Sequence, residues 1–586
     1  MTWDDDRNFL DNFSYRGLDV EHLHWMWTTF HMGHYIPLSW MTLGLDYELW
    51  GMDARGYHFT NLLLHCVNAL LIYFIARRVL RLAAPSLIGA DSRRLDSAAA
   101  FAALFFAIHP LRVESVAWVT ERRDVLSGCF FWAATLAYLR YAPDPQRERR
   151  WYWASLGLYV LAMLSKATSI TLPAILLLLN IYPLKRLGGS AGWRSSEARK
   201  IYLEVLPVGI ISLGAIPLTI LALAPPNQLT LGAKIAVSAY SLALYLWKTI
   251  LPTGLSPLYE MPVHVNALEP RFIVSYIAVI AVALVGWLAW RRWPSVTMAL
   301  LGFFVVTLPL LGIVQNGPQI AADRYTYHAA PALAILVAGA GLTLLTSRAA
   351  SFVRPCAAFL LVAFGALTWR QSTFWHDPLT FWSYVLSRDP QSSIAETALG
   401  TLSVSNQQYA EAIKHLEHAT VLDPTYAEGH DNLGIAYSNV GRVDEAIAQF
   451  HTAIALAPNN HESHNNLGIA LARQGKLQEA IAEYRAAIAI KPDYADAHTN
   501  WGNASLRLGN VDDAIAHYRE AVRLRPDLGG AQLNWGVALA QRGRYAEAVE
   551  HFKAVLAIDP NNADARNYLD RAMQLLSSPP ASSTPP

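Results

Sequence analysis

The chain has 586 residues, of which 53% are hydrophobic and only 16% charged, a balance too apolar for an ordinary soluble protein. Its formal net charge is +1 and it has no basic stripe, which argues against a nucleic-acid partner. The three cysteines lie in apolar runs, which favours buried thiols over a metal site or a disulfide framework: Cys66, Cys129 and Cys356.

Three consecutive aspartates, Asp4 to Asp6, open the chain in MTWDDDRNFLDN, ahead of the first long apolar run. They are either a solvated acidic tail or a carboxylate site held at a membrane surface. The histidines that follow match no common zinc spacing, and we predict hydrogen-bonding roles for them at an interface: His31, His34, His58 and His65.

Residues 58–370 carry eleven successive apolar segments, several of them long enough to cross a hydrocarbon core of roughly 30 Å. So many successive runs predict a polytopic membrane domain and not a soluble core. The segments are 58–80, 97–110, 124–141, 151–165, 168–182, 204–224, 233–250, 271–290, 295–314, 326–346 and 352–369.

Lysine and arginine predict the orientation of these segments. Clusters of them fall within 77–94, 147–150, 185–200 and 291–292, and the positive-inside rule makes these loops cytoplasmic. Eleven crossings would put the two ends on opposite faces, so one segment between 168 and 250 is expected not to span. The non-cytoplasmic parts are then 1–57, 111–123, 251–270, 315–325 and everything after 370.

The second non-cytoplasmic loop, HPLRVESVAWVTERRD, carries Arg112, Arg122 and Arg123 against the charge rule, together with three acids. Its apolar spacing predicts a helix lying in the membrane interface. This helix is either a salt-bridged surface element or a guanidinium cluster that grips a lipid phosphate, since arginine binds phosphate oxygens bidentately.

Three further cations stand near apolar segments. Lys166 and Lys248 either extend to the interface or point into a polar cavity. Arg324, in ADRYTY, either forms a structural pair with Asp323 or joins the same anion site.

From residue 391 the composition becomes helix-forming and a period of 34 residues appears in proline, glycine and alanine. This is the tetratricopeptide pattern of two antiparallel helices per repeat. We predict a linker helix over 371–392, five repeats and a closing helix within 393–576, and a disordered tail at 577–586.

One asparagine recurs with the same period, two residues before the repeat glycine. It either packs locally or forms a ladder along the inner surface of the superhelix, where an amide can pair with the backbone of an extended peptide. The members are Asn432, Asn466, Asn500 and Asn534, and Ala398 replaces the asparagine in the first repeat.

Five stretches, followed by the repeats, resemble the transmembrane and tetratricopeptide-repeat-containing protein family, especially its bacterial members: WDDD, HYIPLSW, GYHFTNLLLH, HPLRVESVAWVTERRDVLS and ADRYTY. The similarity spans nearly the whole chain. It implies an all-α fold, with a polytopic membrane domain of the GT-C glycosyltransferase type followed by a tetratricopeptide α-solenoid. Animal members are implicated in O-mannosylation from a polyprenyl-phosphate sugar.

The resemblance also implies site residues. Trp3, Asp4 and Asp5 match the aromatic-Asp-Asp element of the family's first outer loop, so Asp4 and Asp5 are the expected catalytic carboxylates, with Mg²⁺ or Mn²⁺ as an optional cofactor. Family members carry a span before this element, so we expect a helix either upstream of Met1 or lost. The expected ligands of the donor phosphate are Arg122, Arg123, Lys166, Lys248 and Arg324.

The resulting hypothesis is a glycosyltransferase of the bacterial inner membrane. It would move a sugar, with mannose as one candidate, from a polyprenyl-phosphate donor to a protein acceptor held by the repeats on the periplasmic side. The rival is a non-catalytic, membrane-anchored tetratricopeptide scaffold for protein–protein contacts. The acidic and basic motifs together favour the enzyme.

Overall fold

The computed structural model describes residues 5–10, 12–85, 92–189, 192–222, 229–312 and 317–577. They form two compact units, one ending at Asp389 and the other beginning at Pro390. Both units are helical, and in the described ranges only β1 (Tyr259–Glu260) and β2 (Gln319–Ala321) pair as strands. The predicted all-α fold is confirmed.

The residues before the first apolar segment fold into short helices around their own core. Asp19 caps the first α-helix, because its carboxylate accepts hydrogen bonds from the backbone N–H groups of Glu21 and His22. Phe9 and Trp40 are buried in this core, together with Val119 from a later loop. The elements are η1 (Asp6–Leu10), α1 (Val20–Thr28), η2 (His31–Gly33) and α2 (Pro37–Trp50).

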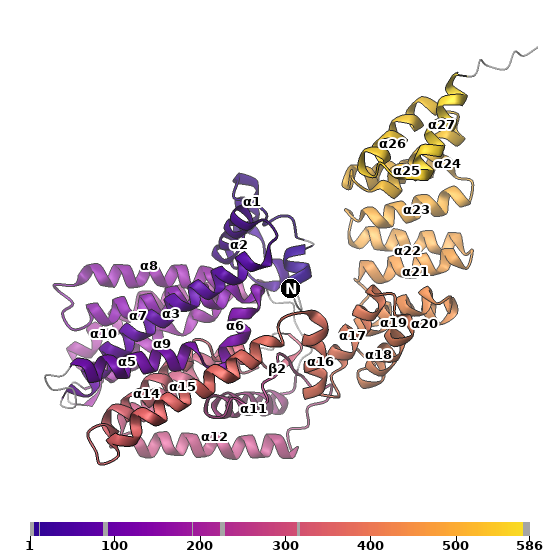
Figure 1. Cartoon of the computed structure of the whole chain (residues 1–586). Helices are drawn as coiled ribbons and strands as arrows, with labels where there is room; N and C mark the ends of the chain where they lie inside the picture. Colours follow the sequence, from indigo (N-terminus) through magenta and orange to yellow (C-terminus); the bar gives the residue numbers. More distant parts are fainter. Residues whose placement is uncertain are drawn as a thin grey trace, which may run out of the picture. The chain divides into compact units, whose positions relative to one another are not determined.

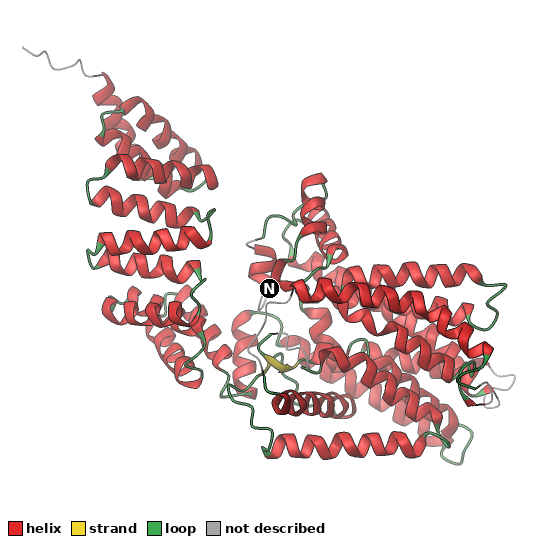
Figure 2. Cartoon of the chain, turned by 180° about the vertical axis from the view of Figure 1, so that it is seen from behind, coloured by secondary structure: helices red, strands yellow, loops and turns green. Residues whose placement is uncertain are grey.

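Each of the eleven predicted apolar segments coincides with a helix (Figures 1 and 2). In the described part of the chain, α3, α10 as far as Pro217, α12 and α15 are long and apolar enough to span a membrane. The eleven helices are α3 (Ala54–Ala83), α5 (Ser92–Ala107), α7 (Arg122–Tyr141), α8 (Arg149–Ser165), α9 (Leu172–Ile181), α10 (Ser196–Ala222), α11 (Leu231–Ile250), α12 (Pro270–Ala289), α13 (Pro294–Thr307), α14 (Ala330–Leu344) and α15 (Ala350–Thr373).

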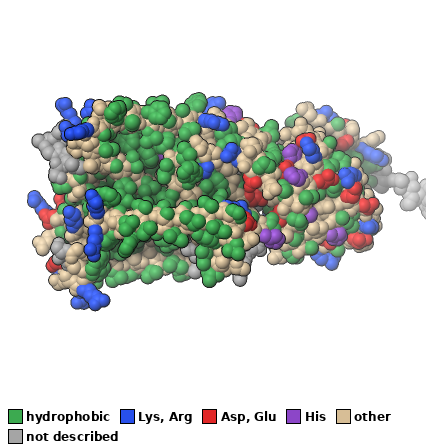
Figure 3. All heavy atoms as spheres, turned by 90° about the horizontal axis from the view of Figure 1, so that it is seen from below, with side chains coloured by type: hydrophobic (Ala, Val, Ile, Leu, Met, Phe, Trp, Pro, Cys, Tyr) green, Lys and Arg blue, Asp and Glu red, His purple; other side chains and the backbone are tan. Residues whose placement is uncertain are grey.

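The flanks of this unit are apolar and exposed. Large side chains such as Phe59, Ile277 and Phe359 are more than half exposed on α3, α12 and α15, on helices long and apolar enough to span a membrane, where contact with lipid makes such exposure favourable. Figure 3 shows hydrophobic side chains over much of the face that it presents, with several lysine and arginine side chains at one end of this unit. The chain is therefore a membrane protein.

The prediction of buried thiols holds for Cys129 and is wrong for the other two cysteines, which are exposed on α3 and α15.

The loop 110–121 is folded into the protein interior. It forms η3 (Pro110–Arg112), α6 (Val113–Ala117) and η4 (Val119–Glu121), and Arg112 and Glu121 are almost inaccessible to solvent. The predicted interfacial helix is wrong. The charged residues on this loop find partners on other loops, so the loop folds inward. Single turns complete the unit: η5 (Ala167–Thr171), η7 (Leu308–Leu310) and η8 (Asp323–Thr326).

Helix α11 lies against loops that the charge pattern places outside. Ser241 Oγ donates to the carbonyl of Ile320 at 2.7 Å, and the carbonyl of Thr249 is 3.1 Å from the His109 ring. These contacts lead us to predict that α11 is the apolar segment that does not cross. Ten crossings would then put both ends of the chain on one face, which stays a prediction.

This topology is testable with reporter fusions that are active only in the cytoplasm. Fusions at residues 380 and 580 are expected to be silent, because both positions lie after an even number of crossings from the outer first loop. A fusion at residue 145, in the arginine-rich loop after α7, is the matched control and should be active. Activity at both 380 and 580 would contradict the topology.

The second unit stacks five helix pairs. The repeat glycine of each first helix faces a large side chain of the second helix: a Cβ on Gly434 would meet Phe450 at 2.6 Å, and one on Gly468 would meet Tyr484 at 2.5 Å. Close packing therefore explains the periodic glycine. The bounds are α17 (Ser393–Ser405), α18 (Tyr409–Leu422), α19 (Ala427–Asn439), α20 (Val443–Leu456), α21 (His461–Arg473), α22 (Leu477–Ile490), α23 (Ala495–Arg507), α24 (Val511–Leu524), α25 (Gly529–Gln541), α26 (Tyr545–Ile558) and α27 (Ala563–Ser577).

The stretch predicted as a linker helix contains the last turn of α15 and then α16 (Pro378–Arg388), which belongs to the first unit. Tyr384 of α16 donates a hydrogen bond to the carbonyl of Leu255 at 2.8 Å. Residues 578–586, the predicted tail except its first residue, lie outside the described residues.

Candidate active site

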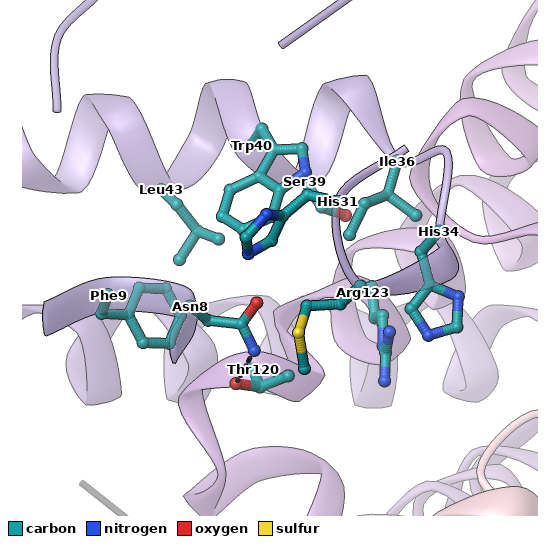
Figure 4. A pocket seen from close by; sticks show the side chains of 11 residues that line it. Asn8, Phe9, His31, His34, Ile36, Ser39, Trp40, Leu43, Thr120 and Arg123 are labelled. Atoms are coloured by element: carbon teal, nitrogen blue, oxygen red, sulfur yellow. Dashed lines mark hydrogen bonds between the residues drawn. The ribbon is translucent and has the colours of Figure 1, made fainter. Parts of the chain in front are cut away.

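A small cavity with a mixed polar and apolar lining lies where the N-terminal segment, the turn before α2, and the loop before α7 meet (Figure 4). Its volume is ≈ 70 Å³, which holds about five water molecules at roughly 10–15 Å³ each. A group of similar size, such as one phosphate, fits this space better than a whole sugar. The lining residues are Asn8, Phe9, His31, Met32, His34, Ile36, Ser39, Trp40, Leu43, Thr120 and Arg123.

Asp5 lies next to this cavity. Its side chain is 1% exposed, and its Oδ1 accepts a hydrogen bond from Thr120 Oγ at 2.8 Å. Thr120 in turn accepts a hydrogen bond from Asn8 Nδ2 at 3.2 Å, and both of these residues line the cavity. The hydrogen bond to Thr120, 115 positions later in the chain, therefore places Asp5, one of the two predicted carboxylates, beside the site. Asp4 lies outside the described residues.

Glu121 is the centre of a buried ionic network. Its carboxylate is 2.6 Å from Arg123 Nη2, 2.9 Å from Lys166 Nζ and 3.2 Å from Arg324 Nε. Burial disfavours its charge, but the three cations outweigh burial and hold the pKa of Glu121 well below its usual range. Three of the five predicted phosphate ligands therefore meet at one point.

Two more carboxylates balance the network. Asp124 is 2.7 Å from Lys166 Nζ, and Glu114 pairs with the Arg324 guanidinium and accepts from its backbone N–H at 2.8 Å. Of the three cations, only Arg123 also lines the cavity. It is therefore the cation that a ligand in the cavity would meet first.

The other two predicted phosphate ligands lie elsewhere. Arg122 is 0% exposed and donates to Asp46 at 2.5 Å, to the backbone carbonyl of Tyr57 at 2.9 Å, and to Asn61. Lys248 donates to the backbone carbonyls of residues 253 and 254, at the end of α11. The side chains of Arg122 and Lys248 are therefore held by structural partners, and neither lines the cavity.

Sequence reasoning missed Thr120 and Asn8 as site residues, and treated His34 only as an interfacial residue. Nothing in their local spacing distinguishes them, because they become neighbours only after residues 5–10 pack on the loop before α7. No group of three or more His, Cys, Asp or Glu side chains suited to a metal ion occurs in the described ranges. The Mg²⁺ or Mn²⁺ ion stays a prediction, since Asp4 lies outside them.

A larger, apolar groove of ≈ 670 Å³ opens between α3, α7, α9, α13 and α14. Most of its lining residues are apolar, as at Leu80, Ile175 and Val306, and His328 also lines it. The His328 ring is 3.1 Å from Ser127 Oγ, one turn along α7 from Asp124. The groove therefore approaches the ionic network, and its lining suits a hydrocarbon chain.

The four ladder asparagines are partly buried along the first helices of repeats two to five. Three of them donate from Nδ2 to the preceding repeats: Asn466 to Asp431 at 3.1 Å, Asn500 to Asn465 at 3.0 Å, and Asn534 to Asn503 at 2.8 Å. Asn432 makes no side-chain hydrogen bond to another described residue. The ladder therefore contributes to the stacking of repeats, and its use for a peptide stays a prediction.

Replacing all four asparagines with alanine is expected to weaken the binding of unfolded peptides to a 391–576 fragment. The same change should lower the melting temperature, because each lost inter-repeat hydrogen bond contributes about 0.5–1.5 kcal/mol. Asn432→Ala alone should weaken peptide binding without that loss of stability, and Asn439→Ala, off the ladder, is the control. Unchanged peptide affinity in the folded quadruple variant would leave the asparagines with a structural role only.

Family models match the second unit. A model described as tetratricopeptide repeat matches residues 432–495 and 499–563, and another described as TPR repeat matches 400–441. The solved structures of similar chains include YrrB, described as a TPR protein with an unusual peptide-binding site, at 19% identity and a TM-score of 0.27, covering 32% of this chain and 96% of that one. A MamA crystal structure shares 27% identity at a TM-score of 0.26, covering 28% and 96%.

Curated relatives match about two thirds or more of this chain. Protein O-mannosyl-transferase Tmtc3 of Drosophila melanogaster is 25% identical over 474 residues, which is 70% of this chain and 50% of that protein. Human protein O-mannosyl-transferase TMTC3 is 23% identical over 443 residues, 70% and 47% respectively. The chain thus spans about half the length of the curated relatives it matches.

Proposed function

We propose that this chain, which resembles the transmembrane and tetratricopeptide-repeat-containing family, is a membrane glycosyltransferase that O-mannosylates proteins from a polyprenyl-phosphate donor. The observation that carries the proposal is that the buried carboxylate of Asp5 accepts a hydrogen bond from Thr120, which lines the same cavity as Arg123 of the Glu121 network. The names of the relatives in flies and humans support the same reaction class.

The donor is an amphiphile, and the first unit offers a place for each of its parts. The apolar groove takes the prenyl chain, and the phosphate lies toward the ionic network, with Arg123 as its first cation. Lys166 and Arg324 pair with Glu121 behind Arg123, so Arg123 is the cation that stabilises negative charge on the phosphate. Arg122 and Lys248 are not part of this proposal, because their side chains are already held by structural partners.

In the proposed reaction, a hydroxyl oxygen of the acceptor protein forms a bond to the anomeric carbon of the sugar. The bond between that carbon and the phosphate oxygen breaks, and its electron pair leaves with the prenyl phosphate. The Asp5 carboxylate takes the hydroxyl proton as general base. Thr120, which lines the cavity, donates to the Asp5 carboxylate and so holds it in place. Asp4 belongs to the same proposal through its place in the sequence motif.

The repeats hold the acceptor in an extended form, by the asparagine ladder. We place the cavity and the repeats on one side of the membrane, the periplasmic side of a bacterial inner membrane. A divalent ion near Asp4 and Asp5 remains part of the proposal as an optional cofactor.

The test is sugar transfer by purified protein. Polyprenyl-phosphate mannose and polyprenyl-phosphate glucose are offered with unfolded peptides rich in serine and threonine, and sugar on the peptide is measured by mass spectrometry. The protein is prepared with and without the coding sequence immediately upstream of Met1. Transfer in either preparation supports the enzyme. Peptide binding without transfer from either donor supports the scaffold instead.

A further inference from the structure

His34 lines the cavity and follows a turn with an unusual backbone conformation. Met32 and Gly33 adopt φ of +52° and +73°, a left-handed conformation that side chains other than glycine rarely adopt. The turn is anchored by His31, whose ring lies against Trp25 and Trp40, with ring centroids 5.9 and 5.6 Å apart. The backbone is therefore held in the shape that directs His34 to the cavity, beside Arg123 (Figure 4).

The charged groups that act on His34 are mostly cations. Arg123, Lys166 and Arg324 oppose a proton on the imidazole and Glu121 favours one, while the neighbouring His31 lies on the same turn. Burial and these cations hold the pKa of His34 well below its ordinary value, so the ring is neutral at pH 7. An anion bound among these cations would reverse the balance and favour the imidazolium.

We propose that His34 is a phosphate-binding residue that takes up a proton when the prenyl phosphate occupies the cavity. The inference rests on the proposed function for the identity of the ligand. Before transfer the donor phosphate is a diester with one negative charge. After the bond to the anomeric carbon breaks, the prenyl phosphate is a monoester that carries up to two charges, since the second pKa of such phosphates is about 6.

The proton balance is closed. Asp5 receives the proton of the acceptor hydroxyl and later returns it to solvent. His34 takes one proton from solvent as the monoester forms, and gives it back when the prenyl phosphate leaves. The imidazolium then donates to a phosphate oxygen as a charge-assisted hydrogen bond, which offsets the second negative charge at the moment it develops.

The experiment is titration calorimetry of the full chain in detergent, at pH 7, in two buffers with different enthalpies of ionisation. The ligands are a short-chain polyprenyl phosphate, inorganic phosphate and the matching polyprenol. For the wild type we expect an uptake approaching one proton per polyprenyl phosphate bound, a smaller uptake with inorganic phosphate, and no uptake with polyprenol. His34→Gln is expected to bind polyprenyl phosphate about 10–150-fold more weakly and without proton uptake, the loss of one charge-assisted hydrogen bond.

His24→Gln, which replaces an exposed histidine of α1, is the matched control and should behave as the wild type. His34→Asn is a second variant in case His34→Gln does not fold. Proton uptake that is the same in the folded His34 variants, or absent in the wild type, would overturn the inference. The readout needs no sugar transfer: a protein that shows His34-dependent uptake but transfers no sugar would contradict the proposed function and leave the phosphate site standing.

Discussion

Asp5→Asn is expected to lower kcat for sugar transfer about 10²–10⁴-fold, the usual contribution of a general base. The amide still accepts the hydrogen bond from Thr120, so the local fold should survive, but it cannot take the hydroxyl proton. KM for the donor should change little, because Asp5 acts on the acceptor. Initial rates of sugar transfer over a range of donor concentrations, at saturating acceptor, separate these two effects.

Asp19→Asn is the matched control for this variant. It lies in the same N-terminal segment and caps α1, a position where asparagine serves as well as aspartate. Asp4→Asn, at the neighbouring motif position, is expected to impair transfer as Asp5→Asn does. Full turnover by the double variant Asp4→Asn/Asp5→Asn would remove the assignment of the base.

The adjacent arginines 122 and 123 should respond to alanine in opposite ways. Arg122→Ala leaves the buried carboxylate of Asp46 without its cation, and breaking such a pair costs about 3–5 kcal/mol. This variant is expected to express poorly and to unfold at lower temperature. Arg123→Ala leaves Glu121 paired with Lys166 and Arg324, so the fold should survive while the KM for the donor rises.

Thermal unfolding in detergent and donor saturation curves measure the two outcomes. Arg55→Ala, an exposed arginine at the start of α3, is the control and should match the wild type in both. An Arg122→Ala protein as stable as the wild type would contradict the structural role of Arg122. An Arg123→Ala protein with an unchanged donor KM would contradict phosphate binding by Arg123. Arg324→Ala should also unfold, because it leaves Glu114 and Glu121 with fewer cations.

Residue patterns that are local in the sequence were enough to predict the architecture. The eleven apolar segments and the 34-residue period each depend on residues close in sequence, since a helix buries or exposes neighbours three and four positions apart. The helices therefore fall where these patterns predict them, from α3 at Ala54 to α27 ending at Ser577. The sequence by itself therefore determined that the protein has a membrane unit and a unit of tetratricopeptide repeats.

The site was decided by tertiary structure. Its pairs join residues far apart in the chain: Thr120 to Asp5 across 115 positions, and Arg324 to Glu114 across 210. The sequence marked Arg122, Arg123 and Lys248 as equivalent cations, yet only one of them lines the cavity. Burial of a charge is tolerated only where a partner comes within a few ångströms, and which partner arrives depends on the packing of distant loops and not on local spacing.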